Sequence, residues 1–104
     1  MNIYETLQKV GIVPVVKIDT AAHAVPLAKA LKSGGLPAAE ITFRSEAAEE
    51  SIRAISKEVP DLFLCAGTVL NPSLARQAVD AGAKAIISPG TNLETISWCK
   101  EKNI

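Results

Sequence analysis

The amino-acid sequence predicts an α/β protein, a parallel (βα)4 array that corresponds to half of a TIM (β/α)8 barrel. Short apolar segments alternate four times with amphipathic stretches of helical periodicity, which is typical of consecutive βα units. A polar or glycine-containing turn follows each apolar segment, and barrels collect such turns at the carboxyl ends of their strands. The first segment is not followed by the G-x-G-x-x-G or P-loop turn of a doubly wound sheet, so a half-barrel is favoured over a small open sheet.

Length and composition favour one globular domain, residues 1–104, with a small-molecule partner. Of the 104 residues, 48% are hydrophobic, which is enough for a core. Eleven basic residues balance eleven acidic ones without a block of like charge, so we expect neither a nucleic-acid partner nor an anionic membrane surface. The apolar runs are too short for a membrane span, and the N-terminus carries no secretion signal. We therefore expect a cytoplasmic protein.

The cysteine and histidine content predicts neither a disulfide nor a metal site. Cys65 and Cys99 are far apart in the sequence, no C-x-x-C spacing occurs, and the chain has a single histidine. Cys65 lies within an apolar run, so we expect a buried, unreactive thiol there and a similar one at Cys99. No residue pattern indicates a metal ion or an organic cofactor.

The first βα unit begins with a valine-rich strand at residues 12–17. Pro14 has no backbone N–H to donate, so it is tolerated only near the start of a strand or at the edge of a sheet. This strand is therefore expected to be exposed along one side.

The first predicted helix begins after Asp19 or Thr20 and ends at the Gly34-Gly35 pair, where glycine adopts positive φ without steric cost. Pro26 lies too deep in this pattern for a proline of the first turn. It is expected to remove one helical hydrogen bond and to bend the start of the helix.

The second unit contains the most informative strand of the chain, residues 38–43. Because side chains alternate along a strand, Glu40, Thr42 and Arg44 are expected on the same face. A parallel strand covered on both faces normally has a continuous run of apolar residues in its sequence. Polar groups gathered at its carboxyl end therefore predict a site rather than packing.

The second predicted helix is capped by Ser45, carries acidic residues near its positive end, and stops before Pro60. Its apolar residues recur at helical spacing and form a single core-facing stripe: Ala48, Ile52, Ile55 and Val59.

The last two units follow the same pattern. A strand at residues 62–66 precedes a helix with Asn71 as N-cap, a proline at its first position and Gly82 at its end. A strand at residues 84–88 precedes a helix at residues 93–102, with Leu93 and Ile96 as its expected apolar contacts. We find no linker or second domain in this pattern.

Four sequence blocks at the predicted strand ends resemble the 2-keto-3-deoxy-6-phosphogluconate aldolase and 4-hydroxy-2-oxoglutarate aldolase family. They are PVVK at 14–17, EITFR at 40–44, AGTV at 66–69 and ISPG at 87–90. Each block alone is weak, but four blocks in order on successive strand ends make a specific match. The resemblance covers the whole chain and implies the same barrel fold.

The resemblance implies a class I aldolase, a lyase in which a lysine forms a Schiff base with the substrate ketone. Carbon–carbon cleavage then releases pyruvate and an aldehyde. Glu40 would be the general acid and base, and Arg44 would bind the carboxylate of a 2-keto acid substrate. Thr68 would contact the same carboxylate, Pro89 would line the pocket, and Lys17 is a further substrate-binding candidate.

The residues themselves leave structural alternatives open for these positions. Glu40 and Arg44 could form an ion pair that closes the end of a strand. Thr68 could be a turn residue before a helix, and Lys17 either faces the pocket or is a solvated strand end.

The resemblance also implies that important parts lie outside this sequence. The family's Schiff-base lysine is on the sixth strand and its phosphate-binding turns follow the seventh and eighth, whereas residues 1–104 end after the fourth helix. A complete barrel needs about 200 residues or more, so the sequence corresponds to an N-terminal half. Such a half exposes two strand edges and an apolar face, and we expect a homo-oligomer, with a twofold dimer as one form.

Three functional hypotheses follow from the sequence. The first is a lyase that acts on 2-keto-3-deoxy sugar acid phosphates or 4-hydroxy-2-oxoglutarate. The second is a non-catalytic half-barrel, a binding or assembly module, because a class I aldolase without its imine-forming amine loses the covalent step. The third keeps the barrel but assigns sugar-phosphate isomerase or synthase chemistry, since one fold hosts many reactions.

Overall fold

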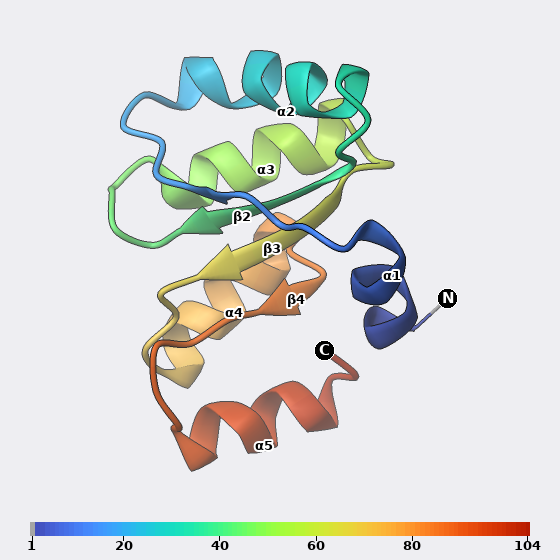
Figure 1. Cartoon of the computed structure of the whole chain (residues 1–104). Coiled ribbons are helices and arrows are strands. Elements are labelled where there is room, and N and C mark those ends of the chain that lie inside the picture. The colour runs from blue at the N-terminus through green and yellow to red at the C-terminus, as the bar shows by residue number, and fades with distance from the viewer. Residues whose placement is uncertain (1) are drawn as a thin grey trace.

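The computed structural model describes residues 2–104, which form a parallel sheet in the order β1-β2-β3-β4 (Figure 1). The strands are β1 (Val15–Val16), β2 (Ala38–Thr42), β3 (Phe63–Gly67) and β4 (Ala85–Ile86). Every neighbouring pair is parallel, and each strand pairs with the next strand in the chain. This arrangement confirms the predicted half-barrel α/β fold.

Helices precede, connect and follow the four strands. They are α1 (Ile3–Val10), the short 3-10 helix η1 (Ala21–His23), α2 (Ala24–Ser33), α3 (Ala48–Glu58), α4 (Pro72–Ala81) and α5 (Leu93–Glu101). Helix α2 contacts α3, α3 contacts α4, and α4 contacts α5. Figure 1 shows this helical layer along one side of the sheet. None of the helices among residues 2–104 has the length and hydropathy needed to cross a membrane.

The core lies between this helical layer and one face of the sheet. Ile41 and Leu64 point from β2 and β3 toward the helices, and both are buried. The expected apolar stripe of α3 is confirmed, because all of its members are buried in the same cluster: Ala48, Ile52, Ile55 and Val59.

Within residues 2–104, the layer formed by α2, α3 and α4 does not extend over the opposite face of the sheet, and α1 and α5 border that face only beside β3 and β4. Its middle row runs across all four strands, because Val15 pairs with Glu40, Glu40 with Cys65, and Cys65 with Ala85. Val15 is 61% exposed and Ile87, beyond the end of β4, is 38% exposed. In a closed barrel the corresponding face is filled by layers of side chains. We call it the open face.

The strand boundaries are shorter at the edges of the sheet than the sequence pattern predicts. β1 and β4 span two residues each, within the predicted segments 12–17 and 84–88. The proline prediction is confirmed, because Pro14 precedes an edge strand and its carbonyl accepts a hydrogen bond of 2.9 Å from the amide of Glu40.

Helix α1 is absent from the sequence predictions, although a local signal for it exists. The Asn2 side chain accepts a hydrogen bond from the Glu5 amide, and the Glu5 carboxylate accepts one from the Asn2 amide. Gly11 ends the helix with φ of 77°. This capping box and glycine end form a recognisable pair of boundary signals. α1 lies at the amino ends of the strands, away from the polar turns (Figure 1).

The prediction for Pro26 is wrong. The chain first forms the 3-10 turn η1, so α2 begins at Ala24 and Pro26 falls within its first turn. The first amides of a helix have no intrahelical partner, so the missing N–H of proline costs no hydrogen bond there. No bend is required.

The predicted cap of the second helix is also wrong. α3 begins at Ala48, after an N-cap residue that makes no side-chain capping bond. Ser45 instead donates a hydrogen bond to the backbone carbonyl of Ile18. By contrast, Asn71 caps α4 as predicted, because its side-chain oxygen accepts a 2.9 Å hydrogen bond from the Leu74 amide.

The apolar contacts of α5 differ from those expected in its first turn. Leu93 is 74% exposed and Ile96 is 52% exposed, whereas Trp98 and Cys99 pack against the core. The guanidinium of Arg76 on α4 lies 5.9 Å from the centre of the Trp98 ring. The last helix is therefore anchored through its second half.

Two neighbouring residues of α3 give a test of the core. Ser51 is fully buried, and its hydroxyl has no hydrogen-bond partner among residues 2–104. An unpaired buried hydroxyl is costly, so we expect Ser51→Ala to raise the free energy of unfolding by about 1 kcal/mol in urea titrations. The matched variant Ile52→Ala should lower it by about 2 to 5 kcal/mol. A clear loss of stability in Ser51→Ala would contradict this interpretation of the hydroxyl.

Candidate active site

The candidate site lies at the carboxyl ends of β1, β2 and β3, on the open face. Strand β2 is buried along its whole length, yet its side chains alternate between two environments. Ile41 joins the helix-side core, so Glu40 and Thr42 lie on the open face. The register pairs Glu40 with Cys65 and Thr42 with Gly67, so these four residues share that face.

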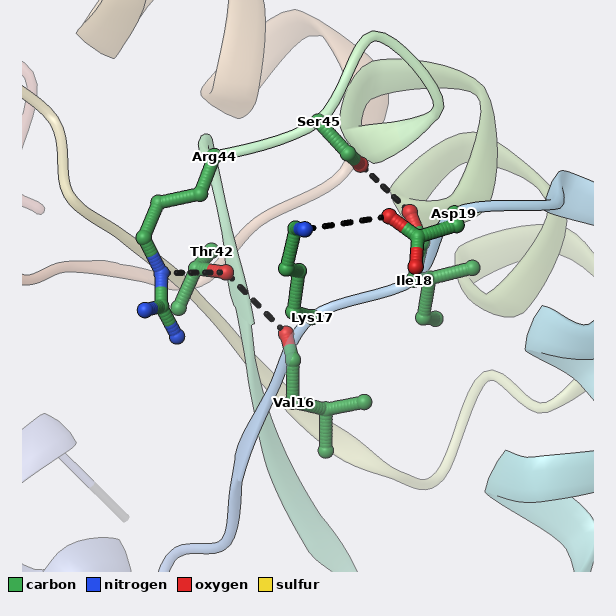
Figure 2. Close-up of polar contacts among 7 residues, drawn as sticks. All are labelled: Val16, Lys17, Ile18, Asp19, Thr42, Arg44 and Ser45. Atoms are coloured by element: carbon green, nitrogen blue, oxygen red, sulfur yellow. Dashed lines mark hydrogen bonds and ion pairs between the residues drawn. The ribbon is translucent and has the colours of Figure 1, made fainter.

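A chain of hydrogen bonds connects Arg44 to the backbone of β1 (Figure 2). Nε of Arg44 lies 3.4 Å from Oγ1 of Thr42, to which it donates. The same hydroxyl donates to the carbonyl of Val16 at 3.3 Å. Ser45 adds a second link through the carbonyl of Ile18. The loop that carries Arg44 is therefore bound to the end of β1 at two points.

Lys17 lies at the end of β1 and forms an ion pair with Asp19. Its Nζ is 3.3 Å from Oδ1 of Asp19, and both side chains are exposed (Figure 2). This geometry agrees with one of the two alternatives for Lys17, a solvated strand end. A substrate-binding role for Lys17 remains a prediction, and it would require a ligand anion to compete with Asp19.

Glu40 is the most buried carboxylate of the candidate site. The residue is only 8% exposed, and it lies on the open face between Val15 of β1 and Cys65 of β3. Burial raises the pKa of Glu40, and the nearby positive charge of Arg44 opposes this rise. Burial is the larger effect. A carboxyl group held in this way is suited to proton transfer closer to neutral pH.

The structure does not support an ion pair between Glu40 and Arg44. Among residues 2–104, the ion pairs join Lys17 to Asp19, Lys32 to Asp61 and Arg53 to Glu49. Arg44 uses Nε for the threonine hydroxyl and influences Glu40 through its charge over a longer distance. The alternative of an ion pair between Glu40 and Arg44 that closes the strand end is therefore wrong.

Thr68 adopts a strained backbone conformation directly after β3. Its φ is 57°, in the left-handed region that β-branched residues rarely occupy. Hydrogen bonds hold the backbone on both sides, because Phe43 N donates to Gly67 O at 2.8 Å and Val69 N donates to Ile87 O at 3.2 Å. Thr68 is thus a turn residue, as the structural alternative describes, but it carries strain of the kind that collects at functional sites.

Pro89 is separate from the polar group at the end of β2. It lies exposed in the turn after β4. A cavity of about 580 Å³ beside β4 includes its neighbours Ser88 and Gly90 but not Pro89. Glu40 and Arg44 do not line this cavity either, whereas Cys65 does. A role for Pro89 in a pocket wall therefore remains a prediction.

Cys65 behaves as the buried thiol that the sequence predicts. It is fully buried, and burial together with the nearby Glu40 raises its pKa to about 11. Cys99 is half-buried, and burial raises its pKa as well. In the part of the chain that the structure describes, no group of three or more His, Cys, Asp or Glu residues is placed to hold a metal ion.

The strain at Thr68 predicts an unusual response to glycine. Thr68→Gly should raise the free energy of unfolding by about 0.5 to 1 kcal/mol, because release of left-handed strain exceeds the backbone entropy that glycine adds. The matched variant Thr91→Gly, at an exposed loop position without positive φ, should lower it. Equal losses in the two variants, measured by urea unfolding, would contradict the strain at Thr68.

The raised pKa of Glu40 predicts a pH-dependent stability. The folded protein holds this proton more tightly than the unfolded chain, so the free energy of unfolding falls as pH rises from the ordinary value of 4.5 through the raised one. Glu40→Gln has no charge to bury, so its stability relative to the parent chain should be greater at pH 7 than at pH 4. Glu46→Gln, an exposed neighbour, serves as the control. A pH-independent difference between Glu40→Gln and the parent chain would count against this burial effect.

Comparisons with known proteins agree on one family. The family of KDPG and KHG aldolases matches residues 3–104. The 2-dehydro-3-deoxy-phosphogluconate aldolase of Treponema pallidum is 44% identical over 99 residues, which are 95% of this chain and 47% of that protein. The chain thus spans about half the length of the curated relatives it matches.

Solved structures give the same result. The 2-keto-3-deoxy-6-phosphogluconate aldolase of Zymomonas mobilis superposes with a TM-score of 0.89 at 36% identity, covering 98% of this chain and 49% of that one. The KDPG aldolase of Legionella pneumophila, solved with pyruvate captured at low pH as a covalent carbinolamine intermediate, has a TM-score of 0.82 at 35% identity and covers 86% and 43%. The chain belongs to the KDPG and KHG aldolase family.

Proposed function

We propose that residues 1–104 form the N-terminal half-barrel domain of a class I aldolase. The substrate would be a 2-keto-3-deoxy sugar acid phosphate or 4-hydroxy-2-oxoglutarate, and the products would be pyruvate and an aldehyde. The observation that carries this proposal is the buried Glu40 on the open face, in a chain of this family. Its pKa is raised, and none of the ion pairs among residues 2–104 includes it.

Glu40 would move protons during the reaction. Retro-aldol cleavage needs a base that removes a proton from the substrate hydroxyl as the carbon–carbon bond breaks. It then needs an acid that returns a proton to the carbon of the enamine left behind. A single carboxyl group with a raised pKa can serve both steps, because burial makes its protonated form easier to reach than that of an exposed glutamate. Its position on the open face leaves it accessible to a substrate bound at the barrel mouth.

Arg44 would bind the carboxylate of the keto acid. Its hydrogen bond to Thr42 uses Nε, which leaves the two terminal amino groups of the guanidinium for a ligand. These groups offer parallel donors that match the two oxygens of a carboxylate. The strained turn at Thr68 would add a hydroxyl and backbone contact to the same carboxylate. Lys17 and Pro89 complete the proposed binding residues.

The imine-forming lysine would come from a part of the barrel outside these residues. The pyruvate carbinolamine in the Legionella pneumophila enzyme supports covalent chemistry between a keto acid and a family member. Lys17 lies at the end of β1 beside Thr42 and Arg44 (Figure 2), and its amine forms an ion pair with Asp19. We therefore assign it a binding role and not a covalent one.

A second function is specific to these 104 residues in isolation. Since the chain covers about half of its relatives, a half-barrel that binds carboxylates without catalysis is the alternative. The isomerase or synthase hypothesis is disfavoured, because the proteins that this chain resembles are named as aldolases. We also propose that the isolated half-barrel forms homo-oligomers through the open face, where Val15 is exposed. The cytoplasmic location expected from the sequence stays a prediction.

The proposal is tested in a chain that has the full length of its relatives. Borohydride reduction in the presence of pyruvate, followed by mass spectrometry, should give a covalent adduct on a lysine outside residues 1–104. Glu40→Gln should lower kcat by about 100-fold or more while the adduct still forms, because only proton transfer is removed. Arg44→Lys should mainly raise KM, since the bidentate contact is lost.

Glu46→Gln is the matched control for these measurements, because it lies exposed in the same loop as Arg44 and outside the proposed site. It should leave kcat and KM unchanged. Absence of any pyruvate adduct would overturn the aldolase assignment. Full activity in Glu40→Gln would remove Glu40 from the mechanism and return the isomerase or synthase hypothesis to consideration.

A further inference from the structure

We propose that Gly67, the last residue of β3, is a positioning residue for Glu40. The absence of a side chain at Gly67 leaves a slot across the β2–β3 pair, and the end of the Glu40 side chain occupies it. The importance of this slot for catalysis rests on the proposed function, but the slot itself is a property of the fold.

The slot has no room for a side chain on Gly67 while Glu40 occupies it. A Cβ atom placed on Gly67 would lie 2.1 Å from Oε2 of Glu40, 2.5 Å from its Cδ and 2.8 Å from its Cγ. Non-bonded carbon and oxygen atoms need more than 3 Å, so no side chain can be added without displacing Glu40. The register explains the proximity, because Glu40 pairs with Cys65 and therefore lies one same-face position before Gly67.

Conformational freedom does not explain the glycine. The glycines with positive φ among residues 2–104 are Gly11, Gly35 and Gly82, so Gly67 has a conformation that other residues can adopt. Its carbonyl accepts a regular hydrogen bond of 2.8 Å from Phe43. Glycine inside a strand weakens the strand and is typical of places where another group approaches closely. Here the approaching group is the Glu40 carboxyl.

Packing is the main restraint that the fold offers this carboxyl group. Within residues 2–104, none of the side-chain hydrogen bonds or ion pairs involves Glu40. Arg44 acts on it only through charge at longer range. Without bonds to fix its rotamer, the carboxyl is held by the walls around it, and Gly67 forms one of these walls. A methyl group in the slot would push the carboxyl toward solvent.

The experiment combines a titration with a double-mutant cycle in the 104-residue chain. In the first part, the carboxyl carbon of Glu40 is followed by NMR as pH changes. Gly67→Ala should shift its titration midpoint downward, toward that of an exposed glutamate, because the displaced carboxyl regains water. Gly90→Ala is the matched control, since a Cβ there has nothing within 4 Å and φ is not positive. It should leave the midpoint unchanged.

In the second part, Gly67→Ala is made in the parent chain and in Glu40→Ala. The thermal midpoint should fall in the parent background and change much less when Glu40 is absent, because the clash then disappears. Equal losses in both backgrounds together with an unshifted midpoint would overturn the proposal. If Gly67→Ala does not fold, recovery of folding in the double variant supports the slot, and failure to recover overturns it.

These readouts do not depend on catalysis. If the coupling between residues 40 and 67 is found but the full-length protein forms no pyruvate adduct, the aldolase function fails and the slot stands. If Glu40→Gln inactivates an adduct-forming enzyme but the coupling is absent, the function stands and the role of Gly67 fails.

Discussion

The alternation of side chains along β2 is the constraint on which the rest of the structure depends. All five residues of the strand are buried, but successive residues face different environments. Ile41 packs against the helical layer, whereas Glu40 and Thr42 lie on the open face. A shift of one residue in the pairing with β3 would exchange these faces, placing a carboxylate in the core and an isoleucine at the site. The same register therefore determines both the stability of the domain and the position of its carboxyl group.

Much of the fold could be predicted from the sequence, because hydrophobic periodicity is a local signal that reports the final burial directly. The stripe of α3 and the cap at Asn71 are examples. Prediction failed where a local signal had a distant partner. Ser45 has the residue type and position of an N-cap, but its hydroxyl bonds to Ile18, which lies 27 residues away. The predicted bend at Pro26 was wrong for a different reason. The 3-10 turn before α2 places the start of the helix close enough to Pro26 for the proline to lie in the first turn.

The candidate site was predicted in its residue types but not in its contacts. Glu40 and Arg44 were visible as polar residues in a buried strand, and an ion pair between them was a reasonable alternative. The sequence could not show that Arg44 would bond to Thr42 instead, because that choice depends on where the loop after β2 is tied to β1. The left-handed φ of Thr68 and the packing of Gly67 under Glu40 are likewise consequences of strand pairing.

Three unfavourable features occur together at the carboxyl ends of β2 and β3. Glu40 is a buried carboxyl group without a hydrogen-bond partner in the described chain, Gly67 is a glycine within a strand, and Thr68 has a left-handed φ. Each lowers stability, through the burial of a carboxyl group, the lack of a side chain within a strand and a left-handed backbone, respectively. Natural sequences depart from local consistency mainly at functional sites. The helix-side core shares the strands with this region but not the face, so the apolar packing around Ile41 can offset the cost without occupying the site. This separation of faces lets one short strand serve both purposes, and it is the physical reason to regard the polar end of β2 as a site and not as a packing defect.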